Sequence, residues 1–197
     1  FLPTSELLEK IKTLQPKQLI SCKCEEHLEH VVAFKWVCHE PATLSQLPDI
    51  SDFQKEFIEE ANQILRIWDI FLKNSAEIEN DIKRSSLKGI HASARVSTHA
   101  IIEGYENVVI EQGATIEAGA ILLAEDGPIY IGKNATVMAG SILRSHVAVC
   151  QKAQVKMAAK IYENTTIGPV CKVGGEVSST VFHSYSNKGH DGFVGNS

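Results

Sequence analysis

The sequence predicts a mainly β protein: a parallel β-helix over residues 89–197, preceded by a small α+β segment over residues 1–88. Two observations predict this division. From Ile131 to Val173 an aliphatic residue returns at every sixth position, and a small or compact residue follows each one four positions later. Residues 1–88 lack this period and show patterns of helix caps and short strands instead. A period of six fits neither an α-helix nor a two-faced strand, but it fits a solenoid with three short strands in each coil.

The N-terminal segment begins with a predicted helix that Thr4 caps. This helix would carry Leu7, Leu8, Ile11 and Leu14 on one face. A β-rich stretch is expected after it, around Leu19–Ile20 and over residues 30–38.

Two further helices are predicted after residue 50. Ser51 and Gln54 form a capping-box pattern, and Asn74 with Glu77 forms a second cap ahead of Ile78 and Ile82. Apolar residues at helical spacing favour an amphipathic helix after the first cap. They are Phe53, Phe57, Ala61, Ile64, Trp68 and Phe71.

Five scattered cysteines favour reduced thiols and a cytoplasmic protein over a disulfide framework. Four potential zinc ligands lie together: Cys22, Cys24, His27 and His30. Structural zinc sites usually pair C-x2–4-C with a matched second pair, which this spacing lacks, so we predict no metal site and interpret the cluster as a surface segment.

The repeat predicts which side chains fill the β-helix. The aliphatic positions should point inward and the small positions should lie near the corners. The register slips near residues 104–107 and 122–128. The aliphatic series is Ile131, Val137, Leu143, Val149, Val155, Ile161, Ile167 and Val173, and the small series is Ala135, Ser141, Val147, Ala153, Ala159, Thr165, Cys171 and Val177.

After Val173 the six-residue period fails. Residues 184–192 intervene, and we interpret them as a loop extruded at a corner, where insertions in solenoids collect and often carry function. The loop holds Lys188, His190 and Asp191 between glycines. Its alternative interpretation is a solvated polar loop.

Composition narrows the functional classes. Hydrophobic residues make up 44% and charged residues 22%, and the net charge is −5. This balance argues against general binding to nucleic acid, and no apolar run reaches the ~18 residues of a membrane span.

The repeat resembles the left-handed β-helix of the hexapeptide-repeat transferases, which implies left-handed crossovers and a homotrimer. Within that class, residues 167–169, 174–176 and 189–197 resemble the acetyltransferase arm of the bifunctional glucosamine-1-phosphate acetyltransferase/N-acetylglucosamine-1-phosphate uridyltransferase family. Glu176 precedes His190 by the family's fourteen residues. Residues 68–74 resemble the tract that joins a sugar nucleotidyltransferase domain to its β-helix.

The resemblance implies site residues and substrates. His190 would be the general base, and Lys160, Glu176 and Phe193 would bind a hexosamine 1-phosphate that acetyl-CoA acetylates. An imidazole can take the amine's proton at neutral pH. Three positions depart from the family: Lys160 replaces an arginine, Phe193 a tyrosine and Ser178 a lysine. These departures bear on the identity of the acceptor more than on the class of reaction.

Other functions remain open. The parent protein could be a sugar-1-phosphate nucleotidyltransferase whose β-helix serves oligomerisation or regulation. A scaffold, or a metal binder using three histidines at subunit interfaces, is a third interpretation, but His91, His99, His146 and His183 show no matched spacing. We expect the chain to be a fragment whose acetyl-CoA site is completed beyond Ser197, inactive by itself and without a nucleotide-binding loop in residues 1–88.

Overall fold

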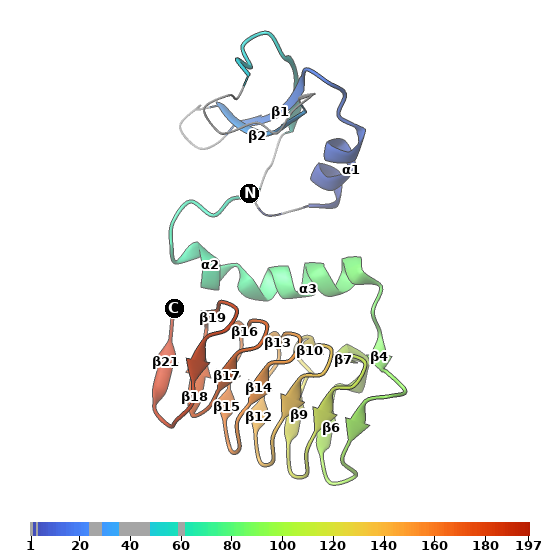
Figure 1. Ribbon diagram of the computed structural model, residues 1–197, viewed down its shortest axis with the longest axis vertical. Coiled ribbons are helices and arrows are strands. Elements are labelled where there is room, and N and C mark those ends of the chain that lie inside the picture. Colours follow the sequence, from blue (N-terminus) through green and yellow to red (C-terminus); the bar gives the residue numbers. More distant parts are fainter. Residues whose placement is uncertain (1, 3, 24–28, 36–47, 59–61) are drawn as a thin grey trace. The chain divides into compact units, whose positions relative to one another are not determined.

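The computed structural model describes residues 2, 4–23, 29–35, 48–58 and 62–197 (Figure 1). The chain divides into two compact units, residues 1–65 and residues 66–197. The sequence placed its boundary at residue 88. Residues 66–88 contain the predicted helical linker, and its helices group with the β-helix because one of them packs on its surface.

The first unit contains one helix and a small mixed sheet. Strand β1 lies in the middle of the sheet, antiparallel to β2 and parallel to β3. The predicted Thr4 cap is confirmed, since its Oγ1 accepts a hydrogen bond of 3.1 Å from the Leu7 amide. Leu7 and Leu14 are buried against Ile20 of the sheet. The elements are α1 Ser5–Thr13, β1 Gln18–Lys23, β2 Glu29–Lys35 and β3 Gln54–Ile58.

The amphipathic helix predicted from residue 53 is wrong. Residues 54–58 form strand β3, which pairs in register with β1 from Gln18 to Cys22. Ser51 lies in a turn, where its amide donates to Asp49. Helical spacing of aromatics was misleading because Phe53 and Ile58 are buried by the sheet while Phe57 is half exposed. Tertiary pairing with β1 therefore overrode the local pattern.

Residues 89–197 form a left-handed parallel β-helix, as predicted. Three six-stranded parallel sheets make its sides, and each coil contributes one strand to each sheet (Figure 1). Sheet I contains β4 Gly89–Ile90, β7 Val108–Ile110, β10 Ile129–Ile131, β13 Val147–Val149, β16 Thr165–Ile167 and β19 Val181–Phe182. Sheet II contains β5 Arg95–Val96, β8 Thr115–Ile116, β11 Thr136–Val137, β14 Gln154–Val155, β17 Lys172–Val173 and β20 Asn187–Lys188. Sheet III contains β6 Ile101–Glu103, β9 Ile121–Leu123, β12 Ile142–Leu143, β15 Lys160–Ile161, β18 Glu176–Ser178 and β21 Phe193–Gly195.

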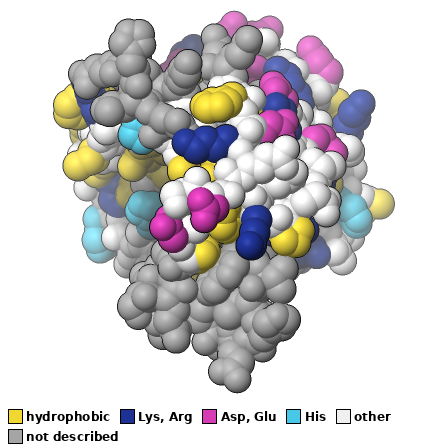
Figure 2. Space-filling model, turned by 90° about the horizontal axis from the view of Figure 1, so that it is seen from above, with side chains coloured by type: hydrophobic (Ala, Val, Ile, Leu, Met, Phe, Trp, Pro, Cys, Tyr) yellow, Lys and Arg dark blue, Asp and Glu magenta, His cyan; other side chains and the backbone are white. Residues whose placement is uncertain are grey.

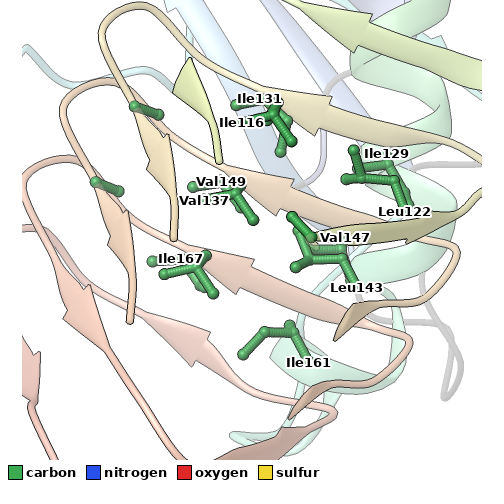
Figure 3. Close-up of a cluster of buried hydrophobic side chains, with 14 of the residues drawn as sticks. Ile116, Leu122, Ile129, Ile131, Val137, Leu143, Val147, Val149, Ile161 and Ile167 are labelled. Atoms are coloured by element: carbon green, nitrogen blue, oxygen red, sulfur yellow. The ribbon is translucent and has the colours of Figure 1, made fainter. Parts of the chain in front are cut away.

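The predicted aliphatic series fills the interior (Figure 3). Each member from Ile131 to Val173 is at most 1% exposed, and Val137, Val155 and Val173 stack in register along sheet II. The small residues Ala135, Ala153 and Ala159 are fully buried beside the corners. Burial of each large aliphatic side chain contributes about 1.5–3 kcal/mol, so the repeat itself supplies the core.

The corners explain why the period slips. The two early irregularities, near residues 104–107 and 122–128, lie at the corners between sheets III and I, and the Asn107 side chain donates to the Ala124 carbonyl across them at 2.8 Å. Gly104 has φ +67°, and a Cβ there would lie 2.4 Å from the Ala124 backbone. Only glycine fits this position without displacing the neighbouring corner.

The extruded loop predicted at residues 184–192 is wrong, because these residues belong to a sixth coil that contains β19, β20 and β21. Its strand β20 pairs with β17, so that Lys188 lies opposite Val173. The period is lost because the corner between β17 and β18 contains only Gly174 and Gly175. The equivalent corners of the two neighbouring coils, residues 156–159 and 189–192, contain four residues each. Val177 consequently occupies an aliphatic position opposite Ile161, not the predicted small position.

A helix covers sheet I. Helix α2 (Asp69–Leu72) leads into α3 (Asn74–Ser85), which runs across β13 and β16 (Figure 1). The cap predicted for Asn74 is wrong: Asn74 is the first residue of α3, and its Oδ1 accepts from Thr166 at 2.8 Å. The β-helix supplies the cap, since Asn164 Oδ1 accepts from the Ser75 amide at 2.8 Å.

Candidate active site on sheet III

Three of the predicted site residues lie in one row on the outer side of sheet III. Lys160 begins β15, Glu176 begins β18 and Phe193 begins β21, and the strand register places Glu176 between the other two. Neighbouring strands in a sheet are about 4.8 Å apart, so Glu176 lies one strand spacing from Lys160 and one from Phe193, although Lys160 and Phe193 are 33 positions apart in the chain. The inward positions beside them, Ile161 and Val177, are buried and fix the outward direction of the row.

The row carries charge and an exposed ring. Lys160 Nζ lies 3.7 Å from Glu176 Oε2, and their side chains are 58% and 40% exposed. Phe193 is 65% exposed. An ion pair this open adds little to stability, since exposed pairs typically contribute 0.2–1 kcal/mol. These side chains are therefore available to a ligand at small cost.

His190 lies in the corner that leads into β21, on the last coil, and is exposed. The short corner of the preceding coil lies next to it: a Cβ added at Gly175 would lie 2.7 Å from the Gly192 carbonyl oxygen and 3.0 Å from Asp191 Cα. The Glu176 amide donates to the Gly192 carbonyl at 3.1 Å. His190 is thus separated from Glu176 by one corner of the coil.

Lys188 supports this corner and does not face a ligand. Its Nζ donates to the carbonyls of Gly174 at 2.7 Å, His190 at 2.9 Å and Gly192 at 2.8 Å. Three donors meet three acceptors, so the ammonium is fully satisfied. The sequence grouped Lys188 with the loop's functional residues, whereas its contacts fix the backbone of the His190 corner.

Sequence reasoning did not single out Arg144, which lies on the same side of the β-helix. Arg144 Nε is 3.0 Å from Glu163 Oε1, with side-chain exposures of 46% and 48%. A cavity of about 140 Å³ on sheet III is lined by Leu123, Ile142, Arg144, Lys160, Ile161 and Tyr162. Arg144 follows Leu143 at the outward position of its strand, a signal that register alone could have given.

Titration shifts occur under α3, away from sheet III. The pKa of Glu79 is lowered first by its hydrogen bond with His146 Nε2, at 2.8 Å, and then by Lys83. Burial raises the pKa of the Cys150 thiol to about 11. Burial and a hydrogen bond to Glu111 raise the pKa of Tyr130. Tyr130 and Cys150 line a cavity of about 370 Å³ beneath α3, whereas Glu79 lines a separate cavity of about 560 Å³.

Metal ligands do not gather in the described part of the chain, where no group of three or more His, Cys, Asp or Glu could hold a metal ion. Cys22 is buried in the core of the first unit, and His30 is exposed on β2. Cys24 and His27 lie outside the described residues. His91, His99 and His183 are exposed at separate corners, and His146 is engaged with Glu79.

The surface has a mixed charge. On the face in Figure 2, basic and acidic side chains alternate with hydrophobic ones. Among the described residues, no helix combines the length and the apolar character that crossing a bilayer requires.

No model of a known protein family matches the chain, and no curated protein matches its sequence. Among solved structures, the acetyltransferase domain of PglB from Neisseria gonorrhoeae FA1090 is similar, with 20% identity and a TM-score of 0.40. The match covers 72% of this chain and 62% of that structure.

Proposed function

We propose that the chain belongs to an acetyl-CoA-dependent N-acetyltransferase that acts on a hexosamine 1-phosphate, with His190 as general base. The observation that carries the proposal is the convergence on sheet III. Lys160, Glu176 and Phe193 share one outward row. His190 lies in the corner that directly precedes Phe193 in the chain. These are the residues that the sequence resemblance implies for the site, and they come from three consecutive coils.

The chemistry assigns a role to each side chain. An amino sugar is mostly ammonium at neutral pH, so His190 would take a proton from nitrogen before the amine attacks the thioester carbonyl. The new C–N bond forms as the C–S bond breaks, and the thiolate of coenzyme A leaves and is protonated. Lys160 would hold the phosphate as a point charge, Glu176 would accept hydrogen bonds from the sugar, and Phe193 would contact its apolar face.

The same family resemblance implies a homotrimer, and the three sheets differ in a way that supports sheet III as the contacting side. Sheet I is covered by α3. The outward residues of sheet II, such as Arg95 and Lys172, are exposed and polar. On sheet III, Ile101 is 50% exposed and continues the row toward Lys160 through Ile121 and Ile142. Replacing Ile101 with glutamate should lower the mass measured by light scattering.

Cysteine chemistry supports a cytoplasmic location. Cys150 and Cys171 are free thiols, the first half-buried and the second buried. Free, buried thiols are typical of reducing compartments.

The test of the proposed function is acetylation of glucosamine 1-phosphate by the full-length protein. The rate is measured from the free thiol that acetyl-CoA releases. His190→Ala should lower the rate about 10²–10⁴-fold, the usual contribution of a general base. His183→Ala is a matched control, because His183 is also exposed on the last coil. Wild-type turnover in His190→Ala, or an equal loss in His183→Ala, would contradict the role of His190.

A nucleotidyltransferase is the second candidate, and the substitutions at two site positions favour it. Ser178 and Phe193 lack the amine and the hydroxyl that the resembling family has there, and both face outward on sheet III beside Glu176. A parent protein of this kind would release pyrophosphate from a nucleoside triphosphate and a sugar 1-phosphate and consume no acetyl-CoA. That result would decide against acetyl transfer.

A further inference from the structure

The cavity on sheet III contains two cations from adjacent coils. Ile142 lies opposite Lys160 in the strand register, and Arg144 is the next outward position after Ile142. Arg144 and Lys160 therefore stand diagonally across one strand gap and both line the cavity. Its volume of about 140 Å³ is several times the ~30 Å³ that one water occupies in the liquid, which leaves room for a phosphoryl group.

Each cation has a carboxylate beside it. Glu163 is 3.0 Å from Arg144, and Glu176 is 3.7 Å from Lys160. The carboxylates are not among the residues that line the cavity, so the cations face it while the anions flank it. All four side chains are 40–58% exposed, so the pairs can exchange partners at little cost.

The charge balance selects a class of ligand. Two cations and two carboxylates sum to zero, which gives a simple anion no net attraction. A zwitterion that carries both a phosphate and an ammonium can satisfy the two cations and one carboxylate together. A guanidinium offers a planar fork for two phosphate oxygens, which the Lys160 ammonium cannot. Leu123, Ile142 and Tyr162 supply apolar surface for a sugar ring.

We propose that Arg144 is a phosphate-binding residue of the site: its guanidinium holds the phosphate of an amino-sugar phosphate together with Lys160, while Glu176 receives the ammonium. The inference rests on the proposed function for the identity of the ligand. The Arg144 guanidinium supplies the planar, two-pronged set of donors that the Lys160 ammonium lacks. Of the other described arginines, Arg66 lies over the Trp68 ring at 5.5 Å from its centroid, Arg84 pairs with Asp81 at 2.6 Å on α3, and Arg95 donates to Thr115 on sheet II at 3.1 Å.

Binding can be measured on this chain by isothermal titration with glucosamine 1-phosphate, glucose 1-phosphate and glucosamine. Arg144→Gln should weaken both sugar phosphates about 10- to 100-fold, as expected for loss of a charge-assisted pair, and leave glucosamine unchanged. Glu176→Gln should weaken only glucosamine 1-phosphate relative to glucose 1-phosphate. Arg95→Gln is the matched control and should bind like the wild type.

Glu163→Gln gives the sharper test, because it removes the carboxylate that competes for Arg144. Affinity for both sugar phosphates should rise about two- to fivefold, the factor expected from an exposed ion pair. The inference is overturned if the wild type binds neither sugar phosphate, if Arg144→Gln binds like the wild type, or if Arg95→Gln loses as much affinity.

The two proposals can fail separately. Weaker binding in Arg144→Gln, together with no acetyl transfer by the full-length protein, keeps the phosphate site and rejects the acetyltransferase. Acetyl transfer with an unchanged KM for glucosamine 1-phosphate in Arg144→Gln rejects the role of Arg144 and keeps the enzyme.

Discussion

Replacing Asn164 with glycine should loosen α3 from the β-helix. Asn164 stands at a corner between sheets III and I with φ +62°, and its Oδ1 accepts hydrogen bonds from the Ser75 amide at 2.8 Å and the Ser75 hydroxyl at 3.0 Å. Glycine keeps the left-handed backbone conformation and removes the one oxygen that accepts both hydrogen bonds. The substitution therefore tests the interaction with the helix and spares the corner.

The expected loss follows from these contacts. Two hydrogen bonds at about 0.5–1.5 kcal/mol each give about 1–3 kcal/mol, and the half-buried position favours the lower part of that range. Glycine also costs about 0.5–1 kcal/mol in backbone entropy. The control is Asn134→Gly, at a left-handed corner with φ +56° whose side chain lies against Gly113. Subtracting its loss leaves the contribution of the cap.

The assay combines denaturant unfolding with hydrogen exchange at the Ser75 amide. Asn164→Gly should lower the free energy of unfolding by about 1–2 kcal/mol more than Asn134→Gly and speed exchange at Ser75. Equal losses in the two variants, with Ser75 still protected, would refute the assignment of Asn164 as the helix cap.

Three further outcomes are expected. The lowered pKa of Glu79 means that its contribution to stability is present above its ordinary pKa of 4.5 and is lost as the pH falls through the lowered value. Glu79→Gln should therefore remove part of the acid dependence of unfolding, and unchanged acid dependence would contradict the His146 contact. Because the pKa of Cys150 is raised to about 11, iodoacetamide at about pH 8 should label it roughly 100-fold more slowly than an ordinary thiol, as measured by peptide mass spectrometry. Labelling at the ordinary rate would show that the thiol is not buried. Val170 is β-branched with φ +64°, so Val170→Asn should raise stability by about 1 kcal/mol in thermal unfolding; a lower melting temperature would mean that lost packing outweighs the relieved strain.

Local patterns were reliable where one period controlled burial. The aliphatic series from Ile131 to Val173 predicted the inward column because each coil repeats the same geometry. Local patterns were wrong at residues 54–58, where pairing of β3 with β1 decided the structure. They also misplaced the cap of α3, since Asn164 lies 89 residues from Ser75 and no local signal links them.

The candidate site divides in the same way. The family resemblance selected Glu176 and His190 by their spacing, and it selected Lys160 by alignment through the repeat register. The loss of the six-residue period after Val173 led to the interpretation of residues 184–192 as an extruded loop. That interpretation missed the structural role of Lys188. Only the structure showed that a two-residue corner at Gly174–Gly175 keeps those residues in the coil and turns Lys188 toward backbone carbonyls.

By itself the sequence determined the β-helix and its core, because a six-residue period fixes which side chain of each strand points inward. The tertiary structure alone decided which outward residues meet. Neighbours across strands depend on how many residues each corner holds, and a corner shortened by two residues changes every contact after it. Arg144 and Lys160 precede that short corner, so the regular coil brings them together, but only the structure shows that both line one cavity.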